Sequence, residues 1–94
     1  MIVTQDNLLV KEIQVDIKNS NGLIQKYDDT SNFIFASILE IGEALDHKTI
    51  YQDKSNILIL RRISKIPFLD GQYFINEKDI LGIMSKDEFE KIKA

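Results

Sequence analysis

The hydrophobic positions near the start of the chain alternate with polar ones, as in a half-buried β-strand. From residue 8 to residue 15, Leu9, Ile13 and Val15 share one face, and polar side chains lie between them. Lys11 interrupts this face, although its long aliphatic stem can lie along apolar surface. We therefore predict a strand over residues 8–15.

Further short apolar runs follow at regular spacing. Residues 33–42 are apolar on both faces except at two positions, which predicts a strand that is covered on both sides. The dipeptide Asp70-Gly71 lies between two apolar runs and predicts a hairpin turn. Beyond the first strand, strands are predicted at residues 33–42, 57–60, 66–69, 73–75 and 80–84.

The last ten residues predict a short helix. Ser85 and Glu88 have the spacing of a capping box, and Phe89 and Ile92 follow at helical spacing. Short strands joined by turns, with one terminal helix, indicate an all-β fold, a small irregular β-barrel that forms a single domain over residues 1–94.

The polar segment at residues 16–32 has no sustained periodicity. Segments of this length without secondary structure are unusual inside a compact domain and are commonly functional. An Asn-Gly dipeptide at residues 21–22 suits a tight turn, and Leu23 and Ile24 then interrupt the polar sequence just before Gln25.

Composition and charge narrow the class of protein. The chain has 12 Lys+Arg against 15 Asp+Glu, and this net charge of −3 disfavours electrostatic binding to nucleic acid or a membrane surface. Without cysteine there is no disulfide framework and no thiolate nucleophile. No apolar run approaches the roughly 18 residues of a membrane span, and Asp6 stands where a secretory signal would be positive. We expect a cytoplasmic protein.

Residues that could carry chemistry are few and scattered. His47 is the only histidine, and a histidine in a polar connection is more often solvated than catalytic. The four glycines are isolated, so they build no phosphate-binding loop. The acidic pairs Asp28-Asp29 and Asp87-Glu88 are adjacent in sequence, which favours solvated or capping roles over a shared ligand. We expect no enzymatic activity, no cofactor and no metal site.

Residues 70–83 carry a family resemblance. Their sequence, D-G-Q-Y-F-I-N-E-K-D-I-L-G-I, resembles the C-terminal signature of GroES-type co-chaperonins, roughly D-G-x-E-Y-L-I-x-x-E-D-D-I-L-A-I. Three other segments agree in order: residues 8–11 are similar to the family's V-I-V-K, residues 37–42 to G-x-V-L-A-V-G, and residues 53–60 to G-D-x-V-L-F. The resemblance covers about residues 7–84.

The resemblance implies a role as a lid without chemistry of its own. Family members form a seven-membered ring of irregular β-barrels that caps a GroEL-type chaperonin and helps to encapsulate unfolded client proteins, while the chaperonin hydrolyses ATP. Each subunit contributes a mobile loop, here residues 16–32, whose apolar tripeptide docks on the chaperonin. By position, Gly22 matches the loop glycine, and Leu23, Ile24 and Gln25 match the tripeptide.

The family also pairs the first strand of one subunit with the last strand of the next. In this chain the implied interface joins two short apolar runs, Leu8, Leu9 and Val10 with Ile80, Leu81 and Ile83.

Four departures from the family pattern stand out. Gln25 is polar where the tripeptide is usually apolar, and Arg61-Arg62 replaces a segment that commonly contains Gly or Tyr. Residues 43–56 are shorter than the family's roof segment and contain neither Gly nor Pro, so we expect a shortened or absent roof hairpin. Residues 85–94 extend past the usual end. Such a divergent member resembles a co-chaperonin encoded by a bacteriophage for use with a host chaperonin, in the host cytoplasm.

Two other functions stay open. A small oligomeric β-barrel that binds single-stranded nucleic acid needs stacking aromatics beside a basic groove, whereas here the aromatics are scattered and the charge is negative. A phage structural protein would also be oligomeric. Size in solution and ATP-dependent binding to a chaperonin separate the three hypotheses.

Overall fold

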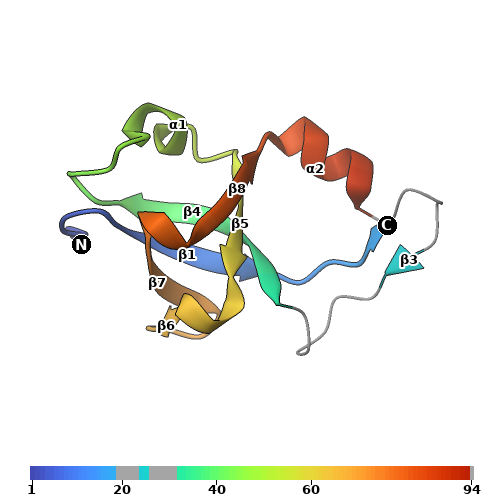
Figure 1. Ribbon diagram of the computed structural model, residues 1–94, viewed down its shortest axis with the longest axis horizontal. Helices are drawn as coiled ribbons and strands as arrows, with labels where there is room; N and C mark the ends of the chain where they lie inside the picture. Colours follow the sequence, from blue (N-terminus) through green and yellow to red (C-terminus); the bar gives the residue numbers. More distant parts are fainter. Residues whose placement is uncertain (19–23, 26–31, 94) are drawn as a thin grey trace.

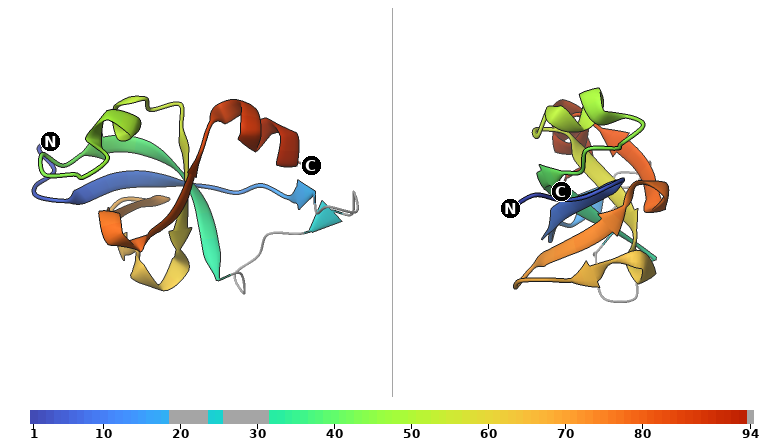
Figure 2. Two further views of the ribbon diagram at one scale, coloured as in Figure 1. Left: turned by 45° about the horizontal axis from the view of Figure 1, so that its top comes forward. Right: turned by 90° about the vertical axis from the view of Figure 1, so that its left-hand side faces the viewer.

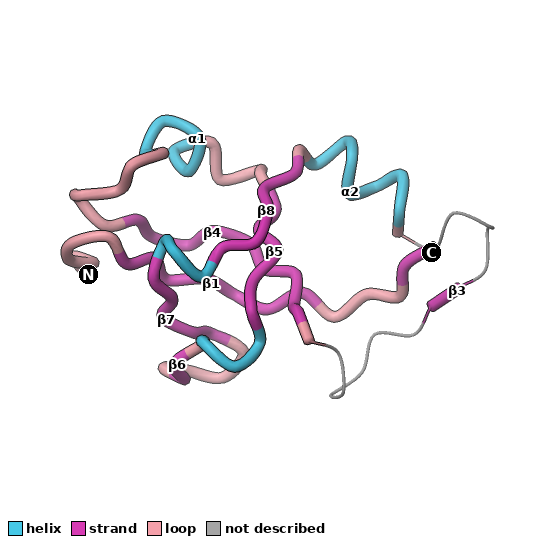
Figure 3. The backbone as a smooth tube through the Cα atoms, viewed as in Figure 1, coloured by secondary structure: helices cyan, strands magenta, loops and turns pink. Residues whose placement is uncertain are grey.

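The computed structural model describes residues 1–18, 24–25 and 32–93. These residues form a curved antiparallel main sheet, a small separate ladder and two short helices (Figures 1 and 3). In the main sheet the strand order is β6-β7-β1-β4-β5-β8. The elements are β1 (Asn7–Ile13), β2 (Ile17–Lys18), β3 (Ile24–Gln25), β4 (Phe33–Ile41), α1 (Lys48–Gln52), β5 (Ile57–Arg61), η1 (Arg62–Ser64), β6 (Ile66–Pro67), β7 (Gln72–Asn76), η2 (Glu77–Asp79), β8 (Ile80–Met84) and α2 (Lys86–Ile92).

The predicted all-β class and the C-terminal helix are both confirmed. The sheet coils strongly on itself, as the end-on view in Figure 2 shows. Within the described residues its two outer strands, β6 and β8, are not paired with each other, so the barrel stays open. A separate two-stranded ladder, β2-β3, lies beyond the end of the main sheet (Figure 1).

The main core lies inside the coiled sheet. Strand β1 contributes Leu8 and Val10, both fully buried. Leu9 alternates with these two residues along β1 and lies on the other face, so the main core takes the face that the predicted row of Leu9, Ile13 and Val15 leaves out. The core residues are Leu8, Val10, Ile34, Ala36, Ile38, Leu45, Tyr51, Leu58, Leu60 and Ile75.

A second apolar cluster covers the other face of β4. It is built on Phe35, Ile57 and Phe89, of which Phe89 comes from α2. The rings of Phe35 and Phe89 lie 5.3 Å apart between centroids. Strand β4 is therefore covered on both sides, as its two apolar faces predicted.

Local turn and cap chemistry agrees with the sequence. Gly71 adopts φ +71°, and the amide of Gln72 donates to the carbonyl of Leu69 at 2.8 Å, which closes the β6-β7 hairpin. Ser85 and Glu88 form the predicted capping box at the start of α2.

Residues 43–56, all of which the structure describes, hold the short helix α1 and no β-hairpin. Tyr51 of this helix is 1% exposed and belongs to the main core. Among the described residues, neither helix has the length and apolar character needed to cross a membrane.

Candidate functional site

The connection between β1 and β4 is longer than the pairing of these two strands requires. These strands are hydrogen-bonded neighbours, and Ile13 lies opposite Phe35 at their paired ends. Antiparallel neighbours can be joined by two to five residues. The chain instead departs after Ile13 and returns at Phe33, a connection longer than closing the sheet needs.

The predicted docking residues fall within this connection. Gly22 and Leu23 lie outside the described residues. The backbones of Ile24 and Gln25 form β3, in which Ile24 pairs with Lys18 and Gln25 with Ile17. The last two residues of the predicted tripeptide thus lie in a short ladder that is separate from the main sheet (Figure 1).

The predicted subunit interface is divided by the structure. Both edges of β1 are used within the chain, since Leu8 pairs with Ile41 on one side and with Ile75 on the other. The span from Leu8 through Leu9 to Val10 therefore has no free backbone edge, and the prediction that it pairs with a strand of a neighbouring subunit is wrong. The central place of β1 follows from its two neighbours, β7 and β4, and not from its own residues.

Strand β8, the other half of the predicted interface, does have a free edge. Among the described strands it pairs only with β5. Leu81 is 54% exposed, whereas Ile80 and Ile83 are half-buried against the main core. The strand reads I-L-G-I-M without a charge, and uncharged free edges favour pairing with another strand.

A second apolar surface lies at the opposite outer strand. A groove of ≈ 430 Å³ is lined by the first residues of the chain together with Ile66 of β6 and Phe74 of β7. Ile2 is 85% exposed and Ile66 is 63% exposed. Exposed apolar residues of this size that gather at one place are typical of interaction surfaces. No sequence pattern predicts this groove, because its residues come from distant parts of the chain.

A polar cluster around Glu77 ties α1 to the turn before β8. The Glu77 carboxylate accepts hydrogen bonds from the amides of Asp46 and His47, at 2.7 and 3.0 Å, and from the Tyr51 hydroxyl at 2.9 Å. These groups line an open cavity of ≈ 420 Å³ that extends to Gly82 of β8.

The cluster shifts two pKa values in opposite senses. Burial by itself raises the pKa of Glu77, but the hydrogen bonds from Asp46, His47 and Tyr51 outweigh it and hold that pKa below its ordinary value. Burial raises the pKa of Tyr51, and the adjacent Glu77 and Asp46 carboxylates raise it further. The arrangement keeps Glu77 charged and Tyr51 neutral near pH 7, which suits a structural contact between α1 and the turn before β8.

His47 meets this cluster through its backbone amide, and its side chain is exposed. Within the described part of the chain, no three His, Asp or Glu side chains lie close enough together to hold a metal ion.

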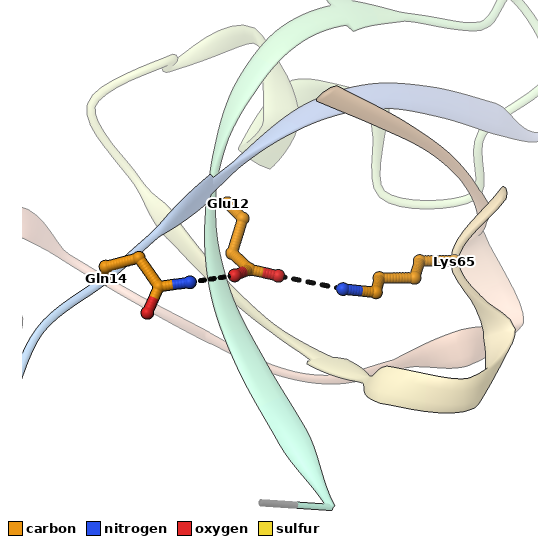
Figure 4. A network of polar contacts seen from close by, with 3 residues as sticks. All are labelled: Glu12, Gln14 and Lys65. Atoms are coloured by element: carbon orange, nitrogen blue, oxygen red, sulfur yellow. Dashed lines mark hydrogen bonds and ion pairs between the residues drawn. The ribbon is translucent and has the colours of Figure 1, made fainter. Parts of the chain in front are cut away.

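A second polar network fixes β1 to the segment before β6 (Figure 4). Glu12 forms an ion pair of 2.9 Å with Lys65 and also accepts a hydrogen bond from Gln14. The Lys65 ammonium lies 4.2 Å from the centre of the Tyr73 ring. The Glu12 carboxylate and the Lys65 ammonium are therefore both bound to groups of this same chain.

No family model matches the chain, and no curated protein matches its sequence.

Proposed function

We propose that this chain is a subunit of a co-chaperonin-type ring, which docks on a GroEL-type chaperonin through residues 16–32 and helps to enclose unfolded proteins. The observation that carries the proposal is the connection between β1 and β4. Two strands that are already paired at Ile13 and Phe35 are joined by a segment far longer than their geometry needs. That segment contains the residues that resemble a chaperonin-docking tripeptide.

The free edge of β8 supports assembly into a ring. An uncharged edge strand with a half-exposed leucine favours aggregation when the subunit is alone. In an oligomer the same edge can pair with a neighbouring subunit. Because Leu8–Val10 lies inside the sheet, the partner strand comes from elsewhere on the neighbouring subunit. The apolar groove beside Ile66 lies at the other outer strand, so a head-to-tail contact can use both surfaces.

In this function the chain does no chemistry, binds no cofactor and leaves ATP hydrolysis to its partner. The described polar clusters fit that role, since the carboxylates of Glu12 and Glu77 each bind groups of this same chain. A cytoplasmic site of action, and a phage origin with a host chaperonin as partner, belong to the same proposal.

Co-elution with a GroEL-type chaperonin tests the proposal. The purified chain should elute alone at about seven times its mass of 10.9 kDa and should bind the chaperonin when ATP or ADP is present. A monomer that binds single-stranded DNA would favour the nucleic-acid hypothesis instead. An oligomer that ignores the chaperonin under every nucleotide condition would favour a structural protein.

A further inference from the structure

The end of the C-terminal helix contacts the start of the 16–32 segment. Ile17 forms an antiparallel bridge with Lys93, the residue that follows α2. On its other side Ile17 pairs with Gln25 of β3. The backbone of Ile17 is thus held from both sides, and Figure 1 shows the C-terminus beside this strand.

Side chains reinforce the contact. Ile13, Val15 and Ile17 alternate along the chain as it leaves β1, and all three pack on the second apolar cluster. Phe89 and Ile92 supply the helix side of that cluster. The root of the segment is therefore part of the folded domain, and α2 is what covers it.

We propose that α2 positions the docking segment by fixing its root at residues 13–18. The inference rests on the proposed function. Ordering residues on binding costs conformational entropy, and a root that is already ordered in the free chain adds none of that cost. In addition, the fixed root sets the place and direction in which the segment leaves the domain.

The geometry favours a positioning role over a latch that must open. Lys93 and β3 lie on opposite edges of β2. The C-terminus therefore does not occupy the outer edge of β3, which faces away from β2. Releasing α2 would also uncover Phe35 and Ile57, which are buried. Binding can therefore proceed while the bridge between Ile17 and Lys93 stays closed.

The test combines a weakened helix end with a cross-link. Ile92→Ser removes one apolar contact at the end of α2, and Lys91→Ser, at an exposed neighbour, is its matched control. The chain lacks cysteine, so Ile17→Cys with Lys93→Cys adds one defined disulfide across the antiparallel bridge.

Ile92→Ser should speed amide exchange at residues 13–18 and weaken binding to the chaperonin, each by about tenfold or more. Adding the oxidised cross-link to Ile92→Ser should restore both the exchange rate and the binding. Ring size should be the same in all variants, and Lys91→Ser should exchange and bind as the wild type does. Unchanged exchange in Ile92→Ser would overturn the inference. So would loss of binding on oxidation of the cross-linked wild type, because that result identifies a latch.

The exchange measurement needs no chaperonin. If the wild type does not bind a chaperonin at all, the proposed function fails, and exchange at residues 13–18 still decides whether α2 fixes this root.

Discussion

The hydroxyl of Tyr51 donates a 2.9 Å hydrogen bond to the carboxylate of Glu77, and this contact joins α1 to the turn before β8. The same carboxylate holds two backbone amides at the start of α1, those of Asp46 and His47. Helix α1 has five residues, and helices this short are marginal without tertiary support. The Glu77 side chain therefore helps to hold the segment in the place of a roof hairpin, together with the burial of Leu45 and Tyr51 in the main core.

Glu77→Ala should destabilise the fold by about 2–3 kcal/mol, since it leaves the buried Tyr51 hydroxyl and two amides without their charged acceptor. Urea unfolding measures the loss. Lys78→Ala, at the exposed neighbour, should change stability by less than about 0.5 kcal/mol. Because Tyr51→Phe removes one of the same bonds, the two changes should be less than additive. Full additivity would mean that the two residues act separately.

The pH dependence of stability should show both members of the pair. The pKa of Glu77 is lower in the folded chain, so its contribution is present above the unfolded value of about 4.3 and is lost as the pH falls through the folded pKa. The pKa of Tyr51 is higher in the folded chain, so its contribution is lost as the pH rises above about 10. Unfolding midpoints across the pH range give the profile.

Two substitutions assign the limbs of that profile. Glu77→Gln should flatten the acid limb, and Tyr51→Phe should flatten the alkaline limb. A Tyr51→Phe variant that loses stability above pH 10 as steeply as the wild type would place the alkaline transition in another group.

Gly42 and Gly82 form a matched pair for a test of packing. A Cβ at residue 42 would lie 2.3 Å from the carbonyl oxygen of Gln5 and 2.7 Å from that of Asn7, both backbone atoms. At residue 82 the nearest atom would be the terminal carbon of Ile59 at 3.6 Å, an ordinary contact. Gly42→Ala should cost about 3 kcal/mol in unfolding experiments, and Gly82→Ala about 0.5 kcal/mol or less. Equal costs would contradict the close approach at Gly42.

Sequence periodicity predicted the parts of the fold that local chemistry specifies. The capping box at Ser85, the turn at Gly71 and the two apolar faces of β4 each follow from a few adjacent residues. It failed where the outcome depends on distant partners. The face of β1 that enters the main core carries Leu8 and Val10, whereas the predicted apolar face with Leu9 and Ile13 lies outside that core.

Two features of the site could not be predicted from the sequence, because they too depend on distant residues. Glu77 belongs to a region that resembles the family signature, yet its role depends on Tyr51, a residue of a different element. The central place of β1 depends on which strands become its neighbours, and no run of residues within β1 records that order. Topology thus decides which predicted interface residues remain available.

Leu81 is predicted to contribute to assembly. Leu81→Lys should leave the stability of the isolated subunit within about 0.5 kcal/mol, because the side chain is half-exposed on an outer strand. It should nevertheless convert the ring to smaller species, since a lysine on an edge strand opposes pairing. Light scattering during size-exclusion chromatography measures the mass. Ile50→Lys, at an exposed position on α1, is the control and should keep the ring intact.

The apolar pair Leu23 and Ile24 is predicted to carry chaperonin binding. Burial of each side chain contributes about 1.5–3 kcal/mol, whereas each residue that becomes ordered costs about 1–2 kcal/mol. We therefore expect a single loop to be a weak ligand. A ring compensates because its first contact tethers the remaining loops near their sites, which raises avidity by orders of magnitude.

Because the tethered loops bind together, a small loss of binding free energy in each loop adds up around the ring. Leu23→Ser or Ile24→Ser should abolish co-elution with the chaperonin, while ring size and the far-UV circular dichroism spectrum stay unchanged. Gln25→Leu should tighten binding and slow release, because it adds apolar surface at the third position. Rings of Leu23→Ser and Ile24→Ser that still cap the chaperonin with normal affinity would exclude this pair as the docking contact and leave the rest of the 16–32 segment to supply it.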